Sequence, residues 1–113
     1  MNPIIRPRAR EDILRQFRWY LVEQDAPDTA LRFMDAVEES VEQLLRMPNM
    51  GAPRPLKNPA LKGLRVWPVK EFDEFLIFYL VQGETLRVVR VLHGKRDIGR
   101  ILNQETPDDE ILQ

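Results

Sequence analysis

The 113-residue chain contains no cysteine and only one histidine, His93. Without cysteine there is no disulfide framework and no thiolate metal site, and a lone histidine does not make a metal site by itself. The longest apolar run, from Phe75 to Val81, has seven residues, far fewer than the ~20 that a membrane span requires. We therefore expect a protein with no metal, no other cofactor and no membrane association.

A surplus of charge of one sign is also missing. Seventeen Lys and Arg face eighteen Asp and Glu, a net charge of −1, whereas proteins that hold nucleic acid mainly through phosphates are usually clearly basic. We therefore expect no direct, stable binding of nucleic acid. The charges are nevertheless uneven: cations gather in residues 54–70 and 87–100, and acids in residues 35–42 and 105–110. A cationic face opposite an acidic one suits a macromolecular partner better than a small neutral ligand.

Apolar periodicity predicts two helices near the start of the chain. A short strand is expected over residues 2–6. Apolar residues then recur at helical spacing from Ala9 to Gln24, with a stripe made of Ile13, Leu14, Phe17, Tyr20 and Leu21, and again from Ala30 to Leu45. Pro27 suits the first position of the second helix. The break between the helices is so short that they should form an antiparallel hairpin.

The second half of the chain reads as a sheet. Residues 47–63 hold four prolines and two glycines, which predicts a loop. Residues 64–70, 75–81 and 86–92 predict an antiparallel meander, with Pro68 marking an edge or a bulge. Asp97 is expected to cap a short helix over residues 97–103.

These elements predict a single α+β domain over residues 1–113. Its order is β-αα-βββ, in two layers, with the helical hairpin packed on a small antiparallel sheet and a short C-terminal helix. The compact part should span about residues 3–103, and residues 104–113 form an acidic tail.

This order and its residues resemble the RelE/ParE superfamily of toxins from bacterial type II toxin–antitoxin systems. The matching pieces cover roughly residues 3–102: ALRFMDAVEESVEQL, P-x-x-G-x-P-R-P at residues 48–55, GLRVWPV, FLIFY and VRVLHGKRDI. The last two pieces, spaced as they are after the G-x-P-R-P loop, are more similar to the ParE branch than to the RelE branch.

The two branches imply different activities. RelE-type toxins are ribosome-dependent endoribonucleases that cut mRNA with positioned Lys, Arg and Tyr side chains. ParE-type toxins cut nothing themselves and act on DNA gyrase, trapping its DNA-cleavage complex. In both branches a neighbouring antitoxin wraps the toxin with its C-terminal segment. The resemblance therefore implies a cytoplasmic protein that forms a hetero-oligomer with a cognate antitoxin, here expected to be a ParD-like ribbon-helix-helix protein, and that serves plasmid or chromosomal stabilisation.

The residues that the RelE pattern needs are largely missing. Ribonuclease chemistry requires groups that move a proton and stabilise charge on the phosphate. The arginine slot of the central strand holds Leu76, and the tyrosine slot after the GKR segment holds Leu102. Only Lys95 and Arg96 match, and Tyr79 is expected in the core. We therefore expect no catalytic residues.

The remaining polar residues are candidates for binding a partner. His93 is expected to cap the end of its strand, with a general-base role as the alternative. Residues 94–96 form either a phosphate-binding nest or a turn with solvated cations. If Val66 and Val88 face the helices, the flanking arginines lie on an uncovered sheet face, which is either a docking surface for an acidic partner or merely solvated. The partner-binding candidates are Arg65, Trp67, Arg87, Arg90, His93, Lys95, Arg96 and Arg100.

The leading hypothesis is a ParE-like toxin that inhibits DNA gyrase by protein–protein contact and is not an enzyme. Two alternatives stay open. One is a RelE-like, ribosome-dependent mRNA endoribonuclease built around Lys95 and Arg96. The other is a degenerate toxin fold that acts only as an antitoxin-binding module.

Overall fold

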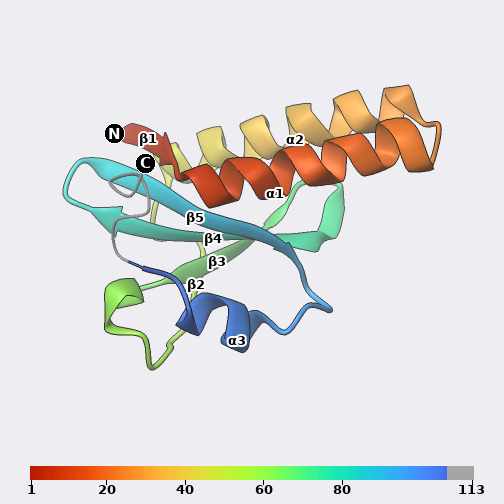
Figure 1. Ribbon diagram of the computed structural model, residues 1–113. Helices are drawn as coiled ribbons and strands as arrows, with labels where there is room; N and C mark the ends of the chain where they lie inside the picture. Colours follow the sequence, from red (N-terminus) through yellow and green to blue (C-terminus); the bar gives the residue numbers. More distant parts are fainter. Residues whose placement is uncertain (107–113) are drawn as a thin grey trace.

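A computed structural model describes residues 1–106 of the chain (Figure 1). It contains a helical hairpin, a five-stranded sheet in the order β1-β5-β4-β3-β2, and a short helix near the C-terminus. The part of the expected acidic tail from residue 107 onward lies outside the described residues. The elements are β1 (Asn2–Ile5), α1 (Pro7–Arg18), η1 (Trp19–Glu23), α2 (Pro27–Arg46), β2 (Ala52–Pro53), η2 (Pro59–Leu61), β3 (Arg65–Val69), β4 (Phe72–Gln82), β5 (Thr85–His93) and α3 (Ile98–Asn103).

The two predicted helices are present and form the hairpin. Pro27 opens α2, as predicted, and Asp28 and Arg46 lie in its first and last turns, where their charges suit the helix dipole. The first helix differs from the prediction at its end, because α1 widens into the π-helical turn η1. Leu14 and Leu21 are each 38% exposed, so the predicted apolar stripe was wrong at these two positions.

The sheet contains the predicted meander and the predicted N-terminal strand, together with one strand that was not predicted, β2. β3, β4 and β5 pair antiparallel, whereas β1 pairs parallel with β5 and β2 adds two residues beside β3. The sheet is therefore mixed rather than purely antiparallel. The strand β2 lies inside the segment predicted to be a loop. The register shifts at Pro68/Val69, as Pro68 had suggested, and again at Phe78/Tyr79.

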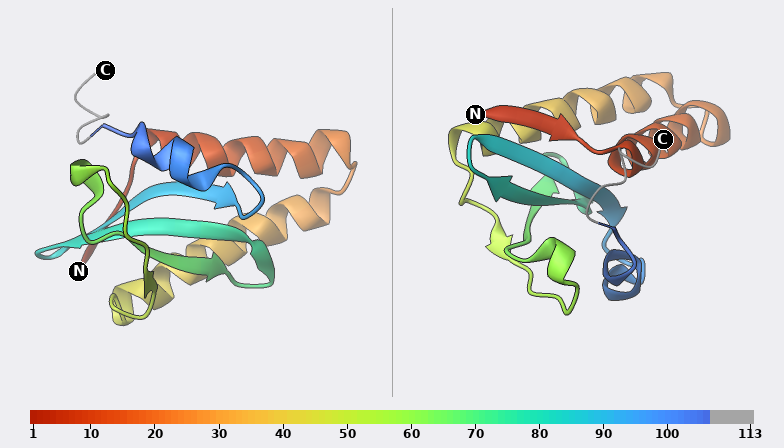
Figure 2. Two further views of the ribbon diagram at one scale, coloured as in Figure 1. Left: turned by 90° about the horizontal axis from the view of Figure 1, so that it is seen from below. Right: turned by 60° about the vertical axis from the view of Figure 1, so that its left-hand side comes forward.

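Both faces of the sheet are covered, which corrects the expectation of an open face. The hairpin packs on one face, around Phe33, Ile77 and Val88. On the other face, η2 and α3 cover a second core that includes Leu61, Phe78, Leu80, Val89 and Leu102. Figure 2 shows this arrangement, with the hairpin on one side of the sheet and α3 on the other. The prediction failed because it treated residues 47–63 as a loop and left this face uncovered, although Leu56 and Leu61 of that segment, with Leu64 after it, pack in the second core.

The placement of the arginines assumed that Val66 and Val88 both face the hairpin. Val88 does, whereas Val66 packs in the second core. No helix among residues 1–106 is long and apolar enough to cross a membrane.

Candidate functional site

A buried ion network joins α1, β5 and the segment after α3. Arg90 donates Nε to Asp12 Oδ2 at 2.7 Å, Nη2 to Asp12 Oδ1 at 2.8 Å and Nη1 to Glu105 Oε1 at 2.7 Å. The Asp12 carboxylate also accepts a 3.0 Å hydrogen bond from the backbone N–H of Val91. That N–H lies on the edge of β5 beyond Val88, the last residue that pairs with β1. Asp12 therefore completes the strand edge and holds Arg90 at once.

This network places Arg90 inside the protein. Its side chain is 10% exposed, and those of Asp12 and Glu105 are 3% and 1% exposed. The hydrogen bonds to Asp12 raise the pKa of Arg90 above its usual value; burial opposes this, and Glu105 adds to it. The expectation that Arg90 lies on an exposed basic face was therefore wrong. The register shift at Phe78/Tyr79 makes Val89 an extra residue of β5 and pairs Arg90 with Phe78 of the second core. That face is covered, and Asp12 and Glu105 hold the Arg90 side chain inside the protein.

Arg65 and Trp67 also lie away from an open sheet face. Both side chains are partly buried. Arg65 donates Nη1 to the carbonyls of Asn49 at 3.1 Å and Gly51 at 2.6 Å, which fastens the loop after α2. Trp67 packs against the core under the hairpin. Arg87 is partly buried and donates Nε to Gln82 Oε1 at 3.3 Å.

The corner after β5 uses its own backbone N–H groups. Gly94 N donates to Glu74 O at 2.7 Å, Lys95 N to the His93 ring Nδ1 at 3.1 Å, and Arg96 N to His93 O at 3.0 Å. With all three donors occupied, these residues form the turn, and the alternative of a phosphate-binding nest is not formed. His93 caps the end of its strand, as predicted, and its Nε2 lies 3.6 Å from Glu74 Oε2.

The positions that a ribonuclease would need are used for packing. Leu76 is partly buried against the second core, and Leu102 is fully buried in it. Tyr79 is fully buried, as predicted. Its hydroxyl donates to Pro48 O at 2.7 Å and accepts from Gly51 N at 2.9 Å. Burial raises the pKa of Tyr79, against the opposing effects of Gly51 and Arg65. This hydroxyl anchors a loop and has no open path to a substrate.

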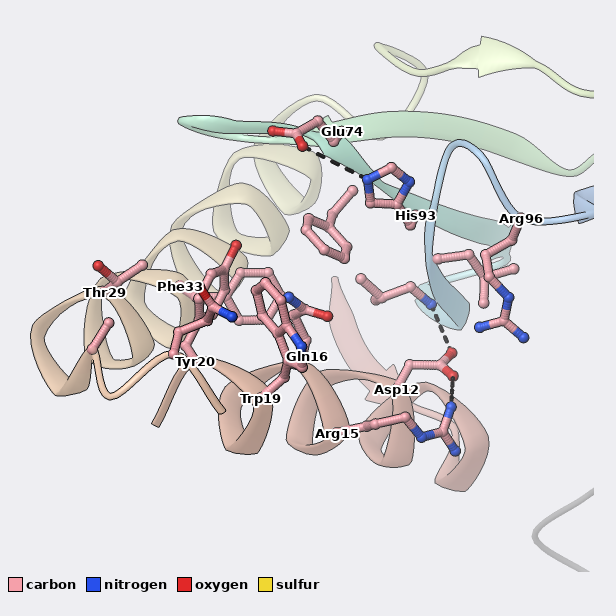
Figure 3. Close-up of a pocket in the computed structure, with 15 residues that line it drawn as sticks. Asp12, Arg15, Gln16, Trp19, Tyr20, Thr29, Phe33, Glu74, His93 and Arg96 are labelled. Carbon is pink, nitrogen blue, oxygen red and sulfur yellow. Dashed lines mark hydrogen bonds and ion pairs between the residues drawn. The ribbon is translucent and has the colours of Figure 1, made fainter. Parts of the chain in front are cut away.

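A cleft of about 660 Å³ lies between the hairpin and the ends of β4 and β5. Figure 3 shows Asp12, Arg15 and Arg96 at one end, and Glu74 with His93 on the sheet side. Of the predicted partner-binding residues, only His93 and Arg96 line this cleft. Lys95 and Arg100 are exposed beyond it, on the corner and on α3. Among residues 1–106, no three His, Asp or Glu side chains gather to hold a metal ion.

The prediction from sequence missed Asp12, Glu105, Arg15 and Trp19. Asp12 carried a usable signal, because it lies three residues after Ala9 and one before Ile13, within the buried stripe of α1. An acidic residue at such a position requires a buried cationic partner. Glu105 carried no such signal, because it follows α3 in an acidic segment.

Comparison with known proteins agrees with this geometry. The family described as the ParE toxin of type II toxin–antitoxin systems, parDE, matches residues 4–98. A solved chain from the chromosomal ParDE toxin–antitoxin system of P. aeruginosa is similar, with a TM-score of 0.66 and 25% sequence identity. The match covers 82% of this chain and 95% of that one. No curated protein matches the chain.

Proposed function

Because the chain belongs to the ParE toxin family of type II toxin–antitoxin systems, which matches residues 4–98, we propose that it is a cytoplasmic toxin that inhibits DNA gyrase by protein–protein contact. An antitoxin partner follows from membership of a toxin–antitoxin family. We propose further that this antitoxin is a ParD-like ribbon-helix-helix protein that forms a hetero-oligomer with the chain.

The burial of Leu76 and Leu102 is the observation that carries the proposal against mRNA cleavage. Leucine can neither donate nor accept a proton, and Leu102 is fully buried in the second core. Tyr79 is equally buried and engaged with Pro48 and Gly51. A chain with these side chains has little means to activate a 2′-hydroxyl or to protonate a leaving oxygen. Inhibition by contact needs neither step.

The proposed surfaces follow from exposure. The antitoxin covers the helical hairpin, which carries exposed apolar side chains such as Leu14, Val22 and Leu31. The corner after β5 and the start of α3, with exposed Lys95, Arg96 and Arg100, contact gyrase. Arg90 takes no part, because it is held inside the protein by Asp12 and Glu105.

A supercoiling assay with purified gyrase tests this function. The expected result is loss of supercoiling with accumulation of cleaved DNA, and recovery of supercoiling when the antitoxin is added in equimolar amount. A translation assay on mRNA-programmed ribosomes is the control and should show no cleavage of the mRNA. Codon-positioned cuts would instead support an endoribonuclease. Normal growth on expression without the antitoxin, with gyrase unaffected, would support an antitoxin-binding module that has lost toxicity.

A further inference from the structure

The cleft between the hairpin and the sheet is built from three separate parts of the chain. α1 with η1 forms one wall, the start of α2 closes one end, and the end of β5 with the start of β4 forms the other wall. Its volume of about 660 Å³ lies within the roughly 300–1,000 Å³ of pockets that take a small ligand or a large side chain. The cleft is therefore large enough to bury one aromatic residue of a partner.

Five rings line this cleft in an unbroken chain. From the hairpin to the strand end they are Trp19, Tyr20, Phe33, Phe75 and His93, and the centroids of successive rings are 5.2, 5.8, 5.4 and 5.1 Å apart. Most pairs meet edge to face, the arrangement that aromatic rings prefer. Phe33 and Phe75 are buried and Tyr20 is partly buried, whereas Trp19 is 43% exposed. Trp19 thus ends the chain of rings with indole surface that a further ring can cover.

Two arginines add positive charge to one end of the cleft (Figure 3). The side chain of Arg15 is 65% exposed and lies 3.9 Å from Asp12 Oδ1, but the Asp12 carboxylate already holds Arg90 through two shorter contacts. Arg96 is exposed at the same end. On the sheet side, Glu74 lies beside His93. A carboxylate that approaches the Arg15 end therefore meets two cations.

We propose that this cleft receives an aromatic side chain of gyrase, with a carboxylate next to it in sequence that pairs with Arg96 and Arg15. The inference rests on the proposed function and assigns the anchor point of that contact. Trp, Tyr and Arg are the residue types most enriched where a few side chains carry most of a binding energy. A folded target needs such an anchor, whereas an antitoxin segment that wraps the toxin spreads its contacts over a long surface.

A nucleotide fits the cleft less well than a peptide does. Asp12 and Glu74 present carboxylates to the same space, and the whole chain has a net charge of −1. Both features oppose the phosphate contacts that supply most nucleic-acid affinity. A carboxylate carries less charge than a phosphate and needs only the arginine end.

A peptide titration tests the chemistry of the cleft. The full-length chain, labelled with ¹⁵N, is titrated with the blocked peptide acetyl-Glu-Phe-Glu-amide and followed by NMR. The indole N–H of Trp19 and the backbone N–H of Arg96 should shift with saturation. The matched peptides acetyl-Glu-Ala-Glu-amide and acetyl-Lys-Phe-Lys-amide, and the nucleotide dTMP, should shift them far less. Equal shifts with the alanine peptide, or stronger binding of dTMP, would overturn the proposal.

Variants then test whether gyrase is the source of that aromatic residue. Trp19→Ala and Arg96→Glu should each raise the concentration for half-inhibition of gyrase by at least about tenfold, as expected for anchor residues. Trp19→Phe, which keeps an aromatic ring, should raise this concentration much less. Met47→Ala and Lys62→Glu, exposed positions outside the cleft, are the matched controls and should change it by less than about twofold. For Arg96→Glu, which lies outside the hairpin, the affinity for the antitoxin should stay within about threefold of that of the unmodified chain.

The outcomes distinguish a failure of the proposed function from a failure of the assignment of the cleft. If the unmodified chain leaves gyrase untouched, the proposed function fails. If it inhibits gyrase and the Trp19 and Arg96 variants inhibit equally well, only the assignment of the cleft fails. If the Trp19 and Arg96 variants lose antitoxin binding and inhibit gyrase unchanged, the cleft binds the antitoxin, which would overturn the inference.

Discussion

Replacing Asp12 by asparagine should cost about 3 kcal/mol of folding free energy. Asparagine keeps one oxygen for the Val91 N–H but puts an amide donor against the Arg90 guanidinium, where two contacts of 2.7 and 2.8 Å now lie. Removing one partner of a buried ion pair costs roughly 3–5 kcal/mol. The lower end applies here, because Glu105 still holds Arg90 Nη1 at 2.7 Å.

This loss is large on the scale of a small domain. Total stabilities are roughly 5–15 kcal/mol, and about 4 °C of melting temperature is lost per kcal/mol at a length near 100 residues, so the Asp12→Asn variant should melt about 12 °C lower. Urea unfolding followed by circular dichroism, with linear extrapolation to water, measures the cost. Glu11→Gln, at the exposed neighbouring position of α1, is the control and should cost less than about 0.5 kcal/mol.

A double-mutant cycle isolates the pair itself. Arg90→Met leaves Asp12 buried without its main partner, so this single variant should also be strongly destabilised. In the double variant both charges are gone, and its loss should be smaller than the sum of the two single losses by about 2 kcal/mol or more. Additive losses, or an Asp12→Asn cost below about 1 kcal/mol, would mean that Arg90 is solvated and would refute the buried network.

Three further outcomes follow from the packing. Tyr79→Phe should cost about 1–3 kcal/mol in urea unfolding, because it leaves Pro48 O and Gly51 N without their buried partner. In an ultraviolet titration Tyr79 should ionise at a pH above the ordinary tyrosine value, because burial raises its pKa. The unfolded chain loses this proton first, near pH 10. The free energy of unfolding should therefore fall as the pH rises above that value. In the Tyr79→Phe variant it should fall less steeply with pH. Gly51→Ala should destabilise the fold, because a Cβ there would lie 2.7 Å from Tyr79 Cε1, whereas Gly99→Ala, which has open space around it in α3, should stabilise it by about 0.5–1 kcal/mol.

Local signals made most of the fold predictable. Pro27 at the first position of α2 and Asp97 as the cap of α3 each act through their own backbone neighbourhood, so a single sequence reveals them. The same holds for the hairpin and the meander, which depend on apolar periodicity and on short connections. The family resemblance rested on this element order, and the match to the ParE toxin family confirms it.

The faces of the sheet were not predictable in this way. Alternation along a strand assigns residues to the two faces of a sheet but does not show what covers each face. The second cover of the sheet depends on contacts between η2 and α3, about 40 residues apart, such as the hydrogen bond from Asn58 Nδ2 to Leu102 O at 2.9 Å. No local pattern in the proline-rich segment, residues 47–63, predicts that it folds back over the second face of the sheet. The exposed arginine surface was therefore overestimated, and Arg90 was assigned to it wrongly.

Packing and ribonuclease chemistry exclude each other at position 102. Leu102 has no exposed surface, and it belongs to the second core together with Leu61, Phe78 and Leu92. A tyrosine there would add volume to a filled core, at a cost of about 1–3 kcal/mol, and would bury a hydroxyl among apolar side chains. The side chain that a RelE-type site needs would thus lie inside the protein, away from any substrate. Restoring a RelE-type tyrosine at this position would require α3 to leave the sheet, which supports the proposal that the chain acts on its target by contact.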